Sequence, residues 1–161
     1  MIGIFSPETL TTWKMWIFGI IRIPLIFFCR PRVVTITETS LEVKIKLNRR
    51  TRNHLNSMYF GVLSIGADVT GGFLAMEYIR KSKSKISLIF KDFHADFLKR
   101  AEGDVHFRCN EGLEISQLVE KTIESGQRQN MVVHISARVP SISDDVVAEF
   151  ELTLSLKEKA S

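Results

Sequence analysis

The sequence feature that most restricts the fold is a long apolar segment, from Met58 to Met76, with one acid near its middle. A helix without a polar face is surrounded by other parts of the protein. The segment therefore predicts a central helix, which follows Asn53 and His54 and runs to about Tyr78, around which the chain packs. Its apolar residues fall on every side of such a helix, and they are Met58, Phe60, Val62, Leu63, Ile65, Ala67, Val69, Phe73, Leu74 and Met76.

The polar residues and glycines of this segment need separate explanations. Burying an ionised carboxylate is costly unless it is paired, so Asp68 indicates either a functional acid or a structural pair with a basic group or an amide. Ser64 is placed to donate a hydrogen bond to a backbone carbonyl one turn earlier. Glycines weaken a helix, so their repetition predicts close approach by another backbone. They are Gly61, Gly66, Gly71 and Gly72.

Residues 1–31 are predicted to form a hydrophobic N-terminal unit packed on a domain spanning residues 32–161. A serine cap followed by proline predicts a helix from Pro7 to about Ile23. A membrane span needs about 20 mainly apolar residues, and charged residues and a proline interrupt this run too early. Two alternatives remain. The helix packs over the domain or its dimer partner, or residues 7–30 make peripheral contact with a membrane surface.

Alternating apolar and polar residues predict strands on both sides of the central helix. Antiparallel strands of this kind, curled around one apolar helix, predict an α+β fold with a sheet of about six strands. A short amphipathic helix ends at Gly126, and the tail from Lys157 is expected to fray. The expected strands cover residues 33–47 (two strands with a turn near Thr39 and Ser40), 86–97, 105–109, 131–139 and 146–156.

Composition narrows the functional classes. The 161 residues fit one domain, 45% hydrophobic content allows a real core, and the net charge of +4 is only mildly basic. Two cysteines give no disulfide framework, which favours a reducing, cytoplasmic compartment. The sequence has no nucleophile elbow, P-loop or dinucleotide fingerprint. Scattered basic residues argue against nucleic-acid binding, and the histidine spacing predicts no metal site.

The run from Tyr59 to Asp68 resembles the "HGG, apolar run, then acid" signature of hot-dog acyl-CoA thioesterases of the phenylacetate-degradation type. The Arg52-Asn53-His54 turn and the hydrophobic N-terminal helix resemble an uncharacterised branch of that superfamily. The resemblance implies a hot-dog fold, a homodimer or dimer of dimers, and hydrolysis of an acyl thioester in a groove between protomers. It implies no cofactor apart from coenzyme A as part of the substrate.

The resemblance also implies roles for individual residues. Asp68 corresponds to the general base or nucleophile, and the Gly61 N–H to an oxyanion-hole donor. Asn53 is expected to orient water or substrate. Tyr59 stands where the family has histidine and is expected to donate a hydrogen bond instead. His54 is a further acid, base or capping candidate, although a lone histidine is more often a surface residue.

Substrate contacts are expected at the helix start, along the helix and in the basic run 80–85. That run is either a solvated turn or a contact for the phosphates of coenzyme A. Because Phe60 replaces the first glycine of the signature, a non-catalytic acyl-binding protein is an alternative function, and a membrane-surface protein is another. The substrate-binding candidates are Asn56, Phe60, Ser64, Lys81 and Lys83.

Overall fold

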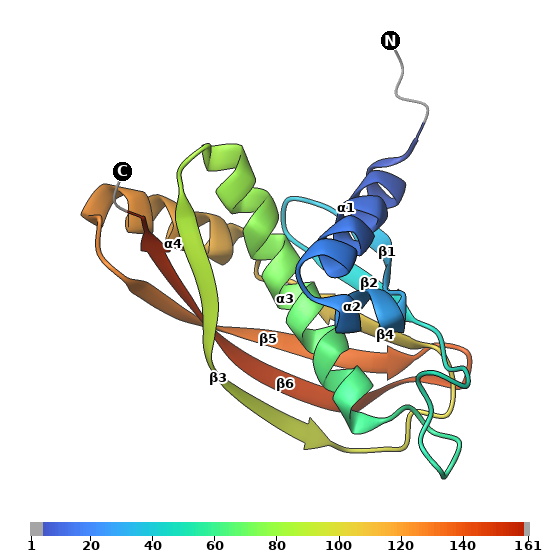
Figure 1. Ribbon diagram of the computed structural model, residues 1–161. Coiled ribbons are helices and arrows are strands. Elements are labelled where there is room, and N and C mark those ends of the chain that lie inside the picture. The colour runs from blue at the N-terminus through green and yellow to red at the C-terminus, as the bar shows by residue number, and fades with distance from the viewer. Residues whose placement is uncertain (1–4, 160–161) are drawn as a thin grey trace.

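The computed structural model describes residues 5–159 and shows a six-stranded antiparallel sheet curled around one long helix, α3 (Figure 1). The strand order is β1-β2-β4-β5-β6-β3, so β1 and β3 form the two edges. This confirms the predicted α+β arrangement. The elements are α1 (Pro7–Ile21), α2 (Pro24–Cys29), β1 (Arg32–Ile36), β2 (Leu41–Ile45), α3 (Phe60–Ser82), β3 (Ile86–Phe97), β4 (Val105–Cys109), α4 (Gly112–Ser125), β5 (Gln129–Val139) and β6 (Ser143–Glu158).

Helix α3 is the centre of the core, as its composition predicts. Among the described residues it is the one helix long and apolar enough to cross a membrane by length and composition, but most of it is buried inside the domain. At Gly66 an added Cβ would overlap the Phe107 ring. The glycine there admits an aromatic side chain from the sheet, and not another backbone as predicted.

The start of α3 agrees with the expectation that Asn53 and His54 precede the helix and that Gly61 lies at its start. The helix begins at Phe60, because the polar residues before it close a turn of their own. The Asn53 side-chain oxygen accepts hydrogen bonds from the backbone N–H groups of Leu55 and Ser57, at 2.9 and 3.2 Å. Asn56 adopts a left-handed backbone conformation with φ 59°, which asparagine tolerates better than most residues. Local side-chain hydrogen bonding therefore competes successfully with the helix.

The end of α3 differs from the expected basic loop. Arg80 and Lys81 lie in the last helical turn, where cations interact favourably with the helix dipole, and Lys83 ends the helix in a left-handed conformation. Residues 157–159 are more ordered than predicted. Strand β6 continues to Glu158, and the Lys159 N–H donates to the Lys85 carbonyl at 2.8 Å.

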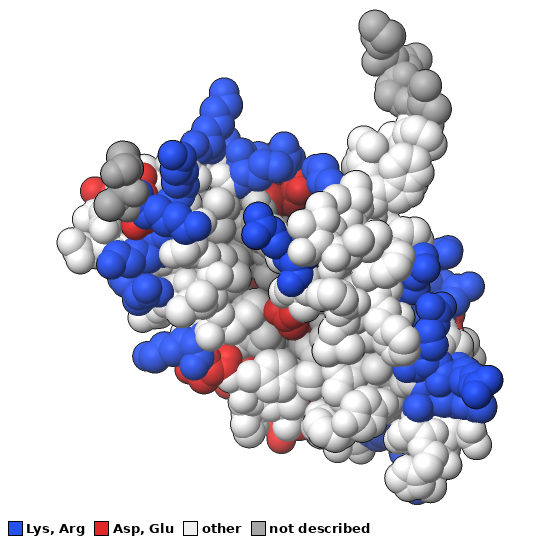
Figure 2. All heavy atoms as spheres, viewed as in Figure 1, with Lys and Arg blue, Asp and Glu red and all other residues white. Residues whose placement is uncertain are grey.

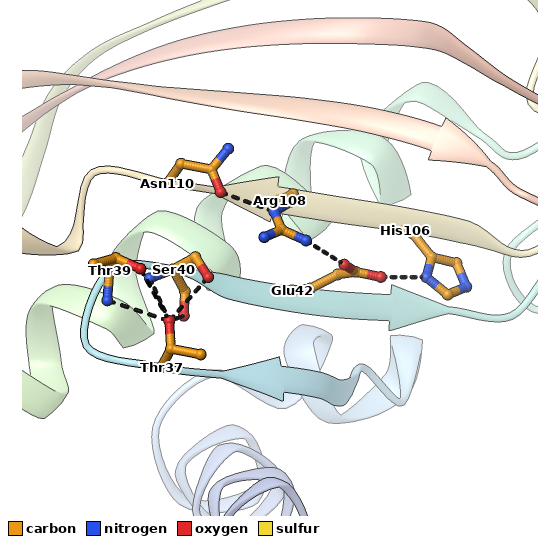
Figure 3. Close-up of polar contacts among 7 residues, drawn as sticks. All are labelled: Thr37, Thr39, Ser40, Glu42, His106, Arg108 and Asn110. Atoms are coloured by element: carbon orange, nitrogen blue, oxygen red, sulfur yellow. Dashed lines mark hydrogen bonds and ion pairs between the residues drawn. The ribbon is translucent and has the colours of Figure 1, made fainter.

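The short helix and the β1–β2 connection match expectation. Helix α4 ends at Gly126, whose φ of 61° suits a residue without a Cβ. In the turn, the Thr37 hydroxyl oxygen accepts hydrogen bonds from the N–H groups of Thr39 and Ser40 (Figure 3).

The outer face of the sheet carries polar contacts between charged and histidine side chains. Glu42 on β2 lies between two residues of β4, with one oxygen 2.7 Å from His106 Nδ1 and the other 3.2 Å from Arg108 Nη1 (Figure 3). His134 similarly pairs with Glu111 at 2.9 Å. These histidines therefore have structural partners on the solvent-facing side of the sheet.

The N-terminal helix α1 ends at Ile21, two residues before the predicted end at Ile23, and a second short helix, α2, begins at Pro24. Helix α1 covers the β1 edge of the sheet, where the Thr12 hydroxyl accepts a hydrogen bond from the Val33 N–H at 2.9 Å. The other edge is different. Among residues 5–159, strand β3 pairs only with β6, so its second side has no strand partner in this part of the chain.

Candidate functional site

A groove of about 820 Å³ opens between α3, the first half of β3 and the α1–α2 junction. Its walls are mainly apolar, with Phe18 and Ile26 on the N-terminal side, Phe73 on α3 and Phe90 on β3. Figure 2 shows the molecular face hollowed between the α1–α2 pair and β3, with basic side chains gathered at one end of the hollow. The shape and lining suit an elongated apolar ligand with an anionic end.

Asp68 lies in the wall of this groove, one helical turn from Gly72. A Cβ added at Gly72 would lie 3.9 Å from an Asp68 carboxylate oxygen and 3.5 Å from the Phe90 ring. Among residues 5–159 the Asp68 carboxylate has no hydrogen-bond or ion-pair partner. Burial therefore raises the pKa of Asp68 from 3.8 to about 6. Such a carboxyl group is suited to exchange protons near neutral pH.

One end of the groove is basic. Lys83 and Lys159 line it, and neither has an ion-pair partner in the described part of the chain. Arg80 and Lys14 also reach the groove but are held by Glu77, at 2.7 and 3.2 Å. The free lysines at this end are therefore the available contacts for an anionic group. Lys159 lies in the tail that the sequence pattern treats as frayed, which is why it was not predicted.

A second cavity, of about 550 Å³, lies at the opposite end of α3 and collects four of the other predicted residues. Asn53, His54, Tyr59 and Phe60 line it together with Phe97 from the far end of β3. The Phe60 and Phe97 rings lie 6.3 Å apart, edge to face. The cavity is therefore an aromatic hollow beside the first turn of the central helix.

The polar candidates at this end are partly occupied by local contacts. The Asn53 amide nitrogen donates to the Ser57 hydroxyl at 3.1 Å, so the whole side chain is engaged in its own turn. The Tyr59 ring covers the first helical turn, because a Cβ added at Gly61 would lie 2.6 Å from Tyr59 Cε1. Asn56 shapes the turn through its left-handed backbone and does not line the cavity.

Two further candidates lie on α3 itself. The Ser64 hydroxyl donates to the Phe60 carbonyl at 3.0 Å, which confirms the predicted bond one turn back. Lys81 lies beside the Tyr78 ring, 5.2 Å from its centroid, and does not line the groove that holds Asp68.

Within one chain the acid and the helix start are separated. Asp68 comes seven positions after Gly61, a distance of about 10 Å along the helix axis. Strand β3 runs past both regions, with Phe90 beside the acid and Phe97 beside the helix start. The sequence could not place these aromatic residues in a site, because alternation along a strand does not reveal which neighbour lies opposite.

Comparison with known proteins identifies the fold. A Pseudomonas aeruginosa protein described as a "Probable Thioesterase" superposes with a TM-score of 0.77 at 20% identity, over 96% of this chain and 97% of that chain. A Haemophilus influenzae thioesterase superposes with a TM-score of 0.66 at 16% identity, over 97% of this chain and 93% of that chain. A Chlorobaculum tepidum protein of unknown function superposes with a TM-score of 0.80 at 9% identity, over 94% of this chain and 97% of that chain. Identities this low show a shared fold alone.

The shared fold is the hot-dog fold, as the resemblance in the sequence implied, and thioesterase-like proteins are prominent among its neighbours. No curated protein matches the sequence at a significant level. The family match covers nearly the whole chain, from residue 13 to residue 156. This chain therefore belongs to the hot-dog family described as "Domain of unknown function (DUF4442)".

Proposed function

We propose that this protein hydrolyses acyl thioesters, with Asp68 as the general base, in a groove completed by a second copy of the chain. The observation that carries the proposal is an unpaired carboxyl group in an apolar groove, with its pKa raised to about 6 by burial. A fold tolerates such a group at a cost in stability, and perturbed pKa values of this kind cluster at functional sites. The acyl chain fits the apolar walls, and the phosphates of coenzyme A fit Lys83 and Lys159.

The second copy is inferred from the open edge of the sheet. Strand β3 has 12 residues and, in the part of the chain that the structure describes, no strand partner on one side, an arrangement that promotes pairing with another chain. Phe93 and Phe97 on this strand are 44% and 49% exposed. Antiparallel pairing of two β3 strands would cover both rings and join two sheets edge to edge.

Such pairing would also bring Asp68 of one subunit close to the start of α3 in the other, although the two lie apart within one chain. If the twofold axis passes between Phe93 and His94, Phe90 lies opposite Phe97 of the partner subunit. Phe90 lies beside Asp68, and Phe97 lies beside Phe60 at the start of α3. In this pairing Asp68 therefore faces the first turn of the partner's α3. Free N–H groups at that turn favour developing negative charge on a carbonyl oxygen.

The reaction follows from this placement. Asp68 takes a proton from water while the water oxygen bonds to the thioester carbonyl carbon. The resulting oxyanion accepts hydrogen bonds from the N–H groups near Gly61. Collapse of this intermediate breaks the carbon–sulfur bond, and the proton on Asp68 passes to the leaving thiolate. The products are a carboxylic acid and a free thiol.

The test of the chemistry is an acyl-CoA panel of increasing chain length, assayed by thiol release. We expect hydrolysis by the wild type with kcat/KM rising through pH 6, and loss of at least 100-fold in Asp68→Asn. Asp144→Asn, at an exposed aspartate at the start of β6, is the matched control and should retain full activity. Equal activity in wild type and Asp68→Asn would remove Asp68 from the mechanism.

The test of the assembly is Phe97→Glu, measured by sedimentation. A charge at the paired edge should convert the dimer to a monomer and remove activity together. Ile142→Glu, at an exposed isoleucine in the β5–β6 turn, should remain dimeric. A wild-type monomer with full activity would contradict the composite groove.

A second candidate function is acyl-CoA binding without turnover. The observation that favours it is the Tyr59 ring, which covers the first turn of α3 at Gly61 and obstructs carbonyl access to the N–H groups there. This alternative predicts that acyl-CoA raises the melting temperature without thiol release. It also predicts that Tyr59→Ala, which uncovers Gly61, gains hydrolysis over the wild type.

A further inference from the structure

The solvent-facing side of α1 is apolar. Its exposed large residues recur at helical spacing along one face, at Leu10, Trp13, Ile17, Ile20 and Ile21. Ile17 and Ile21 are 56% and 68% exposed. Helix α2 extends this surface with exposed Leu25 and Phe28. We call these seven residues the outer apolar face.

The side of α1 that packs on the domain is less apolar, although Phe18 at its edge packs against the Phe73 ring. Its buried residues are Thr11, Thr12, Met15 and Gly19, so only one of the four has a large apolar side chain. In a helix of a soluble domain the apolar side normally faces the core. The outer apolar face is therefore not used for folding, and a surface of this kind marks a site of association.

Arginines border the outer apolar face. The Arg30 guanidinium lies 4.0 Å from the Phe27 ring centroid, and Arg50 lies 5.8 Å from that of Phe28. Arg22 is exposed at the end of α1. In the described part of the chain, none of the three has an ion-pair partner. Their charge is available to an external anion.

The charge is also unevenly distributed along the chain. Residues 1–52 contain nine lysines and arginines and three acids, a net charge of +6 in a chain whose total is +4. The remaining residues are therefore net acidic. Basic side chains (blue) are visible beside the apolar surface of α1 and α2 in Figure 2. Of this net charge of +6, residues 1–31, which carry the outer apolar face, contribute +2, and residues 32–52, which include Arg50, contribute +4.

We propose that the outer apolar face and its bordering arginines dock on the surface of an anionic lipid bilayer. An amphipathic helix of this type lies in the interface, with apolar residues among the acyl chains and cations at the headgroups. Charge decides against a second copy of the chain. A twofold contact through this face would place the arginines of the two copies against one another.

Docking in this orientation also affects the groove that holds Asp68. Ile23, between α1 and α2, is exposed and lines that groove. The groove entrance would then lie near the bilayer surface, where long-chain acyl thioesters partition. Lipid binding does not require the proposed hydrolysis, so the two proposals can fail separately.

Vesicle flotation and tryptophan fluorescence test the proposal on the full chain. Both tryptophans, Trp13 and Trp16, lie in α1, and Trp13 is 46% exposed, so native fluorescence reports on this surface. We expect binding and a blue shift with vesicles of phosphatidylcholine containing phosphatidylglycerol. We expect little of either with phosphatidylcholine alone.

Two sets of variants separate the apolar contribution to vesicle binding from the contribution of the arginines. Ile17→Glu with Ile21→Glu should abolish flotation, while Ile142→Glu, at an isoleucine that is 62% exposed outside this face, should leave it unchanged. Arg22→Gln with Arg50→Gln should weaken the partition coefficient by about 25-fold, at about fivefold per arginine. The absence of flotation by folded wild type would overturn the proposal. A fall in oligomer mass in the Ile17 and Ile21 variant without vesicles would also overturn it, because the face would then bind protein.

Discussion

Replacing Asp68 by asparagine should make the protein more stable, although we expect it to become inactive. Burial raises the pKa of the Asp68 carboxyl from 3.8 to about 6. Each unit of pKa difference between folded and unfolded chains corresponds to about 1.4 kcal/mol, so the ionised side chain lowers the free energy of unfolding by about 3 kcal/mol. Asparagine has nearly the same shape and no charge. We expect Asp68→Asn to recover about 2 to 3 kcal/mol at pH 7.5, since its amide is also partly desolvated.

The stability difference between Asp68→Asn and the wild type should depend on pH. Between about pH 4 and pH 6 the folded chain keeps a proton on Asp68 that the unfolded chain has lost. Wild-type stability therefore falls as the pH rises through this window. The asparagine variant lacks this titration, so its advantage should be near zero below pH 4 and complete above pH 6.

Urea unfolding of both proteins at several pH values measures the difference. In thermal unfolding at pH 7.5, the midpoint temperature of Asp68→Asn should exceed that of the wild type by roughly 5 to 10 °C. Asp144→Asn, at an exposed aspartate, should show no such pH-dependent gain. A loss of stability in Asp68→Asn at pH 7.5, or a gain that is the same at pH 4, would refute the reasoning that burial raises the pKa of Asp68.

Three further predictions concern packing and pairing. Gly66→Ala should lower the free energy of unfolding by about 1 to 3 kcal/mol in urea titrations, because its Cβ would overlap the Phe107 ring. Glu77→Gln should lower it by about 1 kcal/mol at pH 7. Burial opposes ionisation of Glu77, but bonds from two cations outweigh it and lower its pKa, so this loss should disappear in acid. Thr12→Val should cost about 1 to 3 kcal/mol, because the buried Val33 N–H loses its acceptor.

Each of these has a matched comparison. Gly72→Ala, whose Cβ would make ordinary contacts at 3.5 Å, should be neutral or stabilising, and a loss equal to that of Gly66→Ala would contradict the steric explanation. For Glu77, a difference that persists at pH 3 would exclude ionisation as its cause. For Thr12, Thr12→Ser keeps the hydroxyl and should retain most of the stability.

The hydrogen bonds of the turn before α3 explain why the helix starts at Phe60, a boundary that apolar spacing alone does not fix. Spacing treats Asn53 and Asn56 as neutral positions, whereas the Asn53 side chain captures two backbone N–H groups and Asn56 takes a left-handed conformation. The helix end was displaced for a related reason. Arg80 and Lys81 have no apolar pattern, but they are good helix formers, and favourable interaction with the helix dipole keeps them in the last turn.

The sequence by itself determined the central helix, because a segment with no polar face has to be enclosed. It also determined the strands, because alternation with a period of two is local information that any half-buried sheet requires. The hot-dog fold followed from these elements and from the resemblance around Asp68.

Only the tertiary structure decided which residues share a site. It placed Asp68 beside Phe90 and the N-terminal helix, and it placed Asn53, His54 and Tyr59 in another cavity. It also showed that the apolar side of α1 faces solvent. Local patterns specify how apolar a segment is, but the direction that each face takes depends on contacts between residues far apart in the chain.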